Sequence, residues 1–167
     1  GGSWKQVASG LSHTCAIKSD DTLHCWGYNF YGQLGDGTSG TDRLVPTAIN
    51  GGGSWKQVAA SAFHTCAIKS DESLWCWGQN SHGQLGDNST TQRLIPTAVS
   101  GGGTWKKIAA GSSGAGGEYS CGIKSDDTLY CWGFNPNGEL GDGTSGTDRL
   151  VPTGISGGGA WKQVSTG

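Results

Sequence analysis

The sequence contains no methionine, not even at position 1. We therefore expect the 167 residues to be a processed product, a trimmed chain or part of a longer chain. For the same reason, the lack of a recognisable signal peptide does not count against secretion. Charged residues are scarce, at 14% against about 25% in a typical protein, and the net charge is only −2. Such a balance does not favour binding to nucleic acid or to an anionic membrane surface.

Long apolar segments and helical patterning are also absent. No apolar run approaches the ~20 residues that a membrane-spanning helix needs, so we expect no membrane insertion. Apolar residues do not recur with the period of an amphipathic helix. Glycine, in contrast, is abundant, at 32 of 167 residues against an average share of about 7%. These features favour short strands joined by turns.

Internal repetition is the dominant feature of the chain. A Trp-Lys-Gln/Lys-Val/Ile segment occurs at intervals of roughly 50 residues, beginning at Trp4, Trp55, Trp105 and Trp161. Each unit continues with a cysteine-containing hairpin, a polar loop and a strand that contains proline. Four short strands in about 50 residues are typical of one β-propeller blade.

We therefore predict an all-β chain of β-propeller blades, each made of four antiparallel strands. The blade repeats are expected at residues 1–50, 51–100 and 101–156, and the third contains a Gly-rich insertion at 111–117. Residues 157–167 would supply the opening strand of a fourth blade. Three blades and one strand make a partial propeller, or one that is completed by oligomerisation.

The six cysteines occupy equivalent places in the three predicted hairpins. In the first hairpin, Cys15 lies opposite Cys25 in the register that also pairs Ile17 with Leu23. The same register gives the pairs Cys66/Cys76 and Cys121/Cys131. Each pair could form a disulfide, bind a metal or remain as two buried thiols. Disulfides are favoured over metal binding, because the neighbouring histidines are not repeated in every unit.

Several motifs together carry a family resemblance. They are the segment from Val7 to Ile17, the Cys-Trp-Gly triplet, the loop from Gly32 to Thr38, and the Arg43…Pro46 spacing. These motifs resemble the regulator of chromosome condensation repeat family. The resemblance implies a β-propeller, usually of seven blades in a closed ring. The family includes a nucleotide exchange factor for a small GTPase, a β-lactamase inhibitor, plant photoreceptors and extracellular receptor domains. The cysteine pairs resemble its extracellular and bacterial branch, which implies an oxidising compartment.

Other conspicuous residues receive structural interpretations. His13 and His64 are expected to be hydrogen-bonded structural histidines, because no nucleophile with a base and an orienting group recurs around them. The tryptophan after each second cysteine should pack against a neighbouring blade; these are Trp26, Trp77 and Trp132. The aspartates of the Leu-Gly-Asp loops should stabilise turns rather than bind calcium; these are Asp36, Asp87 and Asp142. Asn88 begins a glycosylation sequon, which has meaning only in a secretory eukaryotic cell.

Two places are candidates for binding a partner. Trp75 is an extra aromatic residue on a strand where the other repeats have His24 and Tyr130. The Gly-rich insertion supplies the other candidates, Gly114, Ala115 and Gly116.

No catalytic constellation, cofactor motif or complete metal-ligand set is found, so we expect a non-enzymatic protein without a cofactor. The favoured function is a secreted, disulfide-stapled binding or scaffold module whose partner is another protein or a further copy of the chain. The alternative is a structural subunit that joins head to tail into a ring or an extracellular fibre, because three blades cannot close a ring. Guanine-nucleotide exchange on a small GTPase rests on family analogy alone and is less favoured.

Overall fold

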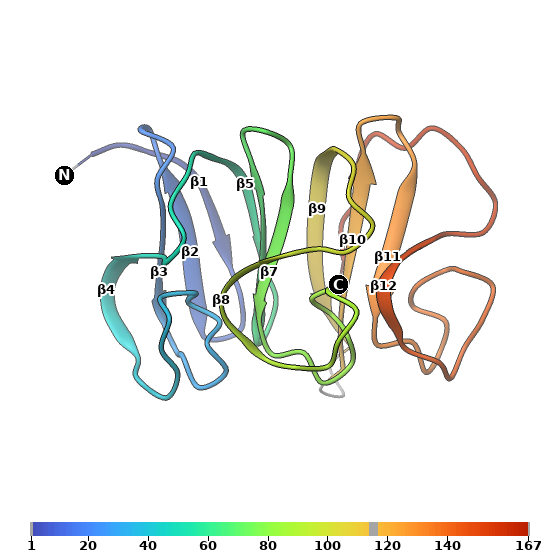
Figure 1. Ribbon diagram of the computed structural model, residues 1–167, viewed down its shortest axis with the longest axis horizontal. Coiled ribbons are helices and arrows are strands. Elements are labelled where there is room, and N and C mark those ends of the chain that lie inside the picture. Colours follow the sequence, from blue (N-terminus) through green and yellow to red (C-terminus); the bar gives the residue numbers. More distant parts are fainter. Residues whose placement is uncertain (1, 114–116, 167) are drawn as a thin grey trace.

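The computed structural model describes residues 2–113 and 117–166, which form three four-stranded antiparallel sheets placed side by side (Figure 1). Within each sheet the strands follow one another in chain order. The predicted all-β architecture of propeller blades is confirmed, since the described residues contain twelve strands and no helix. Accordingly, no helix in this part of the chain is long and apolar enough to cross a membrane.

We call the three sheets blades 1, 2 and 3. Blade 1 contains β1 (Trp4–Ser9), β2 (His13–Lys18), β3 (Leu23–Gly27) and β4 (Arg43–Ala48). Blade 2 contains β5 (Trp55–Ala60), β6 (His64–Lys69), β7 (Leu74–Gly78) and β8 (Arg93–Ala98). Blade 3 contains β9 (Trp105–Ser112), β10 (Glu118–Lys124), β11 (Leu129–Gly133) and β12 (Arg149–Gly154).

The central hairpin of each blade has the register expected from the sequence. Cys15 pairs with Cys25 and Ile17 with Leu23, and the other two hairpins repeat this pairing. All six cysteines form disulfides, in the pairs Cys15–Cys25, Cys66–Cys76 and Cys121–Cys131. Each bridge therefore joins the two middle strands of one blade.

The apolar cores lie between blades rather than inside them. The first core combines the disulfide of blade 1 with Trp55 and Trp77 from blade 2. The second combines the disulfide of blade 2 with Trp105 and Trp132 from blade 3. At ~25 cal/mol per Å² and ~200 Å² per side chain, each buried tryptophan contributes about 5 kcal/mol before its ordering cost. The disulfide face of blade 1 is thus covered by blade 2, and that of blade 2 by blade 3.

The end of the described chain already occupies the position of a further blade. The backbone N–H of Trp161 donates to the carbonyl of Asp127 at 2.8 Å. The backbone N–H groups of Trp55 and Trp105 make the equivalent bond to the preceding blade. Val164 packs against the cluster formed by the third disulfide and Leu140. Residues 161–166 therefore lie where an inner strand belongs, but the described residues include no following strand with which they could form a ladder.

Candidate functional site

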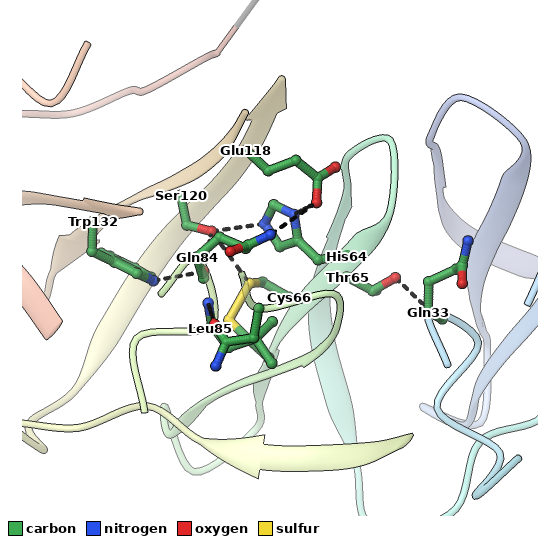
Figure 2. The surroundings of a disulfide bond; sticks show 11 residues. Gln33, His64, Thr65, Cys66, Gln84, Leu85, Glu118, Ser120 and Trp132 are labelled. Carbon is green, nitrogen blue, oxygen red and sulfur yellow. Dashed lines mark hydrogen bonds and ion pairs between the residues drawn. A yellow bond between two sulfur atoms is a disulfide. The ribbon is translucent and has the colours of Figure 1, made fainter. Parts of the chain in front are cut away.

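Each contact surface between successive blades, here called a seam, is crossed by one indole. Trp77 Nε1 donates to the carbonyl of Gln33 in blade 1, and Trp132 Nε1 donates to that of Gln84 in blade 2, both at 2.9 Å. Figure 2 shows the second of these bonds. Both indoles are fully buried, so the predicted packing against a neighbouring blade is confirmed for them. Trp26 has no preceding blade in the described chain and is only half-buried.

Glycine lets the loop of one blade approach the indole of the next. Gly86 has a φ of +68°, and a Cβ built on it would lie 2.7 Å from Trp132 Nε1. A Cβ built on Gly35 would likewise lie 2.6 Å from Trp77 Nε1. The third copy of this glycine, Gly141, has a φ of +65°, but its nearest neighbour would lie at 3.9 Å. The three positions thus share one backbone conformation and differ in what covers them.

Replacing Gly86 with alanine is expected to cost about 3 kcal/mol of unfolding free energy. About 1 kcal/mol comes from the left-handed backbone conformation and about 2 kcal/mol from the clash with Trp132. The Gly141→Ala variant is the matched control, because it carries the backbone cost without the clash and should lose about 1 kcal/mol. Urea unfolding of the two variants measures the difference; equal losses would show that the indole does not constrain this glycine.

The seam between blades 2 and 3 contains a buried polar cluster (Figure 2). His64 Nδ1 lies 2.9 Å from Glu118 Oε2, and His64 Nε2 lies 2.8 Å from Ser120 Oγ. The Ser120 hydroxyl donates to the Gln84 carbonyl at 2.9 Å, so its oxygen accepts from His64. Both ring nitrogens of His64 are then donors, which makes the histidine and the carboxylate a buried ion pair.

Glu118 is held ionised by the groups around it. Burial alone would raise its pKa, but His64 lowers that pKa through its charge and its hydrogen bond. The N–H of Phe63 and the hydroxyl of Ser61, at 2.6 and 2.8 Å from Oε1, lower it further. The pKa of Glu118 therefore lies below its ordinary value. The β5–β6 turn and β6 of blade 2 thus converge on one carboxylate of blade 3.

Ser120, His64 and Glu118 are hydrogen-bonded in the same order as the serine, histidine and carboxylate of a catalytic triad. This set is not apparent in the sequence, because its members come from two repeats and Glu118 follows the insertion of the third. All three side chains have 0% exposure, and the serine proton is engaged by Gln84. The arrangement therefore joins two blades, and no substrate can reach the serine.

The seam between blades 1 and 2 lacks the carboxylate. His13 Nε2 lies 2.8 Å from Thr65 Oγ1, whose hydroxyl donates to the Gln33 carbonyl at 2.8 Å. His13 Nδ1 is buried without a partner among the described residues, because Phe63 stands where the third repeat has Glu118. Burial, reinforced by the charge of His64, lowers the pKa of His13 to about 4. The structural interpretation of both histidines agrees with these contacts, but only His64 is ion-paired.

The loop aspartates stabilise turns, as the sequence suggested. Asp36 accepts from the Thr38 N–H at 3.0 Å and also binds Arg43 Nε at 2.6 Å. The arginine was not anticipated, although it follows each aspartate at a nearly fixed spacing; the pairs are Asp36–Arg43, Asp87–Arg93 and Asp142–Arg149. In the third loop, the Thr144 hydroxyl and Arg149 hold the pKa of Asp142 at about 2. The described residues contain no group of three or more His, Cys, Asp or Glu suited to a metal ion.

Trp75 is half-buried and already engaged. Its Nε1 donates to Ser73 Oγ at 2.8 Å, and the Lys69 ammonium lies 4.3 Å from its ring centroid and 5.1 Å from that of Trp55. Blade 3 repeats this arrangement with Lys124 between Trp105 and Tyr130. Trp75 thus belongs to a repeated lysine–aromatic sandwich, and partner binding there stays a prediction. The other candidates lie outside the described residues; they are Gly114, Ala115 and Gly116.

One sheet face of blade 1 is not covered by any of the described residues. Trp4 is 43% exposed and Val7 63%, whereas their equivalents in blades 2 and 3 are at most 4% exposed. Leu44 on β4 is 91% exposed. In blades 2 and 3 the preceding blade covers the equivalent face. We call this surface the open face of blade 1.

A hollow of about 630 Å³ lies where turn segments of the three blades meet. Its lining is mainly apolar and consists of Ser9–Leu11, Ala60–Phe63, Ala110–Ser112 and Thr166. Leu11 is 73% exposed there. The size and the apolar lining are those of a ligand or side-chain pocket.

Comparison with known proteins identifies the family. A family model described as "Regulator of chromosome condensation (RCC1) repeat" matches residues 20–68, 71–123 and 126–167. A second model with the same description matches residues 4–33 and 55–84. The chain belongs to the RCC1 repeat family. The first two of the longer matches run across a seam, so the RCC1 sequence unit is offset from the structural blade.

Relatives with RCC1 repeats are considerably longer than this chain. The ultraviolet-B receptor UVR8 of Arabidopsis thaliana is 36% identical over 150 residues, which are 89% of this chain and 33% of the receptor. Prp20p from Saccharomyces cerevisiae has a TM-score of 0.80 at 26% identity, covering 92% of this chain and 38% of that one. Human WBSCR16 matches with the same values. The chain therefore spans about a third of the length of these relatives.

Proposed function

We propose that the protein is a non-enzymatic, disulfide-stapled propeller segment that acts as a protein-binding scaffold in an extracellular, oxidising compartment. The observation that carries this proposal is one buried disulfide at the same place in every blade. Paired cysteines persist in oxidising environments and are rare where thiols are kept reduced. Three independent pairs, each confined to its own hairpin, are also difficult to explain as redox or metal chemistry.

Binding of a protein partner is supported by the surfaces and by the relatives. The hollow bordered by Leu11 and Phe63 offers apolar contact area on a rigid support. Among the similar structures, Prp20p is described together with its binding to Gsp1p and histones, and in a complex with Kap60. Those partners belong to that protein; what they suggest for this chain is the class of ligand, a folded protein that contacts an RCC1 propeller.

Intact mass measured on natively isolated protein tests the proposal. We expect no free thiol before reduction and a gain of six hydrogens after it, since the structure contains three bridges. Native spectra of the same sample should show the chain with a bound protein rather than alone. Rapid alkylation at the moment of isolation is the control for oxidation in air. Six alkylated cysteines in that sample would contradict an extracellular location.

Head-to-tail assembly is the second candidate function, and the open face of blade 1 specifically favours it. The same type of face is buried in both seams of the chain, where it is covered by the preceding blade. A face that is complementary to the other end of its own chain is a heterologous interface, which generates rings or fibres.

A further inference from the structure

One carboxylate oxygen bonds two buried nitrogens in the seam between blades 2 and 3 (Figure 2). His64 Nδ1 lies 2.9 Å from Glu118 Oε2, and Gln84 Nε2 donates to the same oxygen at 3.4 Å. All three side chains are fully buried. Glu118 therefore satisfies a histidine of β6 and a glutamine of the β7–β8 loop at once.

The seam between blades 1 and 2 repeats the two nitrogens but not the carboxylate. Their counterparts are His13 Nδ1 and Gln33 Nε2, which are buried without a hydrogen-bond partner among the described residues. His13 is 3% exposed and Gln33 0%. Buried polar atoms are nearly always hydrogen-bonded, because an unpaired one carries the whole cost of its desolvation. Two such atoms at corresponding places point to a bound group that pairs with both.

Both side chains are held in the same orientation as their counterparts. Gln33 Oε1 accepts from the backbone N–H of Tyr31 at 2.9 Å, which leaves the amide nitrogen as the remaining donor. His13 Nε2 lies 2.8 Å from Thr65 Oγ1, which leaves Nδ1 on the other side of the ring. The corresponding glutamine and histidine of the next seam make the same bonds. The two nitrogens are therefore directed toward one place, as those that bind Glu118 are.

Phe63 stands in blade 2 where Glu118 stands in blade 3, and it supplies no acceptor. Its ring packs against Tyr31, with the ring centroids 5.1 Å apart. Gly10 lies beside the unpaired histidine nitrogen, because a Cβ built on it would lie 2.8 Å from His13 Nδ1. Gly10 also lines the hollow where the turns meet. A small molecule in that hollow would therefore lie next to His13.

We propose that the seam between blades 1 and 2 binds a small carboxylate, such as formate or acetate, between His13 Nδ1 and Gln33 Nε2. One carboxylate oxygen accepts from these two nitrogens, as Glu118 Oε2 does from their counterparts. The other accepts from the backbone N–H of Ser12, the counterpart of the N–H that donates to Glu118 Oε1. Because both nitrogens are buried, the ligand is limited to an acid of a few atoms. The bound carboxylate joins blades 1 and 2 as Glu118 joins blades 2 and 3.

Binding is coupled to the uptake of one proton. The Thr65 hydroxyl donates to the Gln33 carbonyl, so Nε2 carries the proton of the neutral His13 ring, and Nδ1 must gain a proton to donate to a carboxylate. Burial, followed by the charge of His64, lowers the pKa of His13 to about 4, while the charge of Glu118 acts in the opposite direction. Formate should therefore bind about tenfold more tightly at pH 5 than at pH 6.

A formate titration followed by NMR of the histidine rings is the measurement. The chain has four histidines, so selective labelling gives four signals that single substitutions assign. At pH 5 and constant ionic strength, the His13 signal should shift and saturate with a dissociation constant of about 1–10 mM, near the limit for a ligand of three non-hydrogen atoms. The His24 signal is the internal reference, because this ring lies beside Lys18, outside the seam.

Phe63→Glu and Phe30→Glu separate the site from a general effect of added charge. Phe63→Glu supplies the carboxylate from the chain itself, so formate should no longer shift the His13 signal. Phe30 also packs against Tyr31, but it is 58% exposed and outside the site, so Phe30→Glu should bind formate as the parent does. Gln33→Leu removes one donor and should weaken binding at least tenfold. Thermal unfolding checks that each variant folds.

A saturable shift of His13 in the parent and in Phe30→Glu, but not in Phe63→Glu, supports the carboxylate site. If Phe63→Glu does not fold, the loss of affinity in Gln33→Leu decides in its place. A His13 signal that formate leaves unmoved, far above the expected dissociation constant, overturns the proposal and assigns the two nitrogens to water. An equal shift with sodium chloride also overturns it, because the place then binds anions without preference for a carboxylate.

Discussion

Reduction of the three disulfides is expected to unfold the protein at room temperature. Each bridge joins cysteines 10 positions apart, so the chain-entropy relation gives about 2.5–3 kcal/mol per bridge and about 8 kcal/mol for all three. Domains are typically stable by only about 5–15 kcal/mol. The disulfides of blades 1 and 2 also lie in the inter-blade cores, so their loss loosens the packing of the adjacent tryptophans.

The three bridges should be reduced in a definite order. Cys121 and Cys131 are 5% and 4% exposed, while the other four cysteines are fully buried. A thiolate must reach a sulfur atom to attack it, so the bridge of blade 3 should open first. Mild reduction followed by alkylation and peptide mass mapping would place the first label on these two cysteines.

Unfolding is followed by the fluorescence of the eight tryptophans, four of which are fully buried. The control is the same sample treated with oxidised dithiothreitol, which should leave the spectrum unchanged. A fully reduced chain that melts at the same temperature as the oxidised one would show that the bridges do not stabilise the blades.

Much of the blade could be predicted because its determinants are local and repeated. The hairpin register follows from Cys15/Cys25 and Ile17/Leu23, which are close in sequence and constrained by a short turn. Strand alternation places the Trp77 side chain on the face opposite to Cys76. The same inference holds independently in each of the three repeats. The architecture was therefore accessible from spacing alone.

The seams were much less accessible, because their contacts join residues about 50 positions apart. His13 and His64 look equivalent in the sequence, yet only His64 meets a carboxylate. Glu118 aligns with Phe63 in the preceding repeat, and the insertion before it conceals this correspondence. Such differences depend on which blade lies beside which.

Replacing Glu118 with glutamine is expected to destabilise the protein by about 3 kcal/mol at neutral pH. The amide keeps the shape of the carboxylate but lacks the negative charge that accepts hydrogen bonds from His64, the Phe63 N–H and the Ser61 hydroxyl. Removing one partner of a buried ion pair typically costs 3–5 kcal/mol, and the lower value applies where a hydrogen bond can be retained. Urea unfolding at neutral pH measures the loss.

The contributions of Glu118 and His13 to stability can be distinguished because they change over different pH ranges. The pKa of Glu118 is lowered by folding, so its contribution is complete above its ordinary value of 4.5 and is lost as the pH falls through the folded value. The pKa of His13 falls from 6.5 to about 4, so the unfolded chain binds a proton first and stability decreases between these two values. Across that interval the loss is about 3 kcal/mol.

The parent protein should therefore lose stability in two successive steps on acidification. Glu118→Gln should retain the first step, which belongs to His13, and lack the second. Glu72→Gln is the matched control, because Glu72 is a solvent-accessible carboxylate paired with Lys56, and its loss should leave stability nearly unchanged. If Glu118→Gln and Glu72→Gln unfold alike at every pH, the buried pair does not hold blades 2 and 3 together, and the seam is maintained by its tryptophans alone.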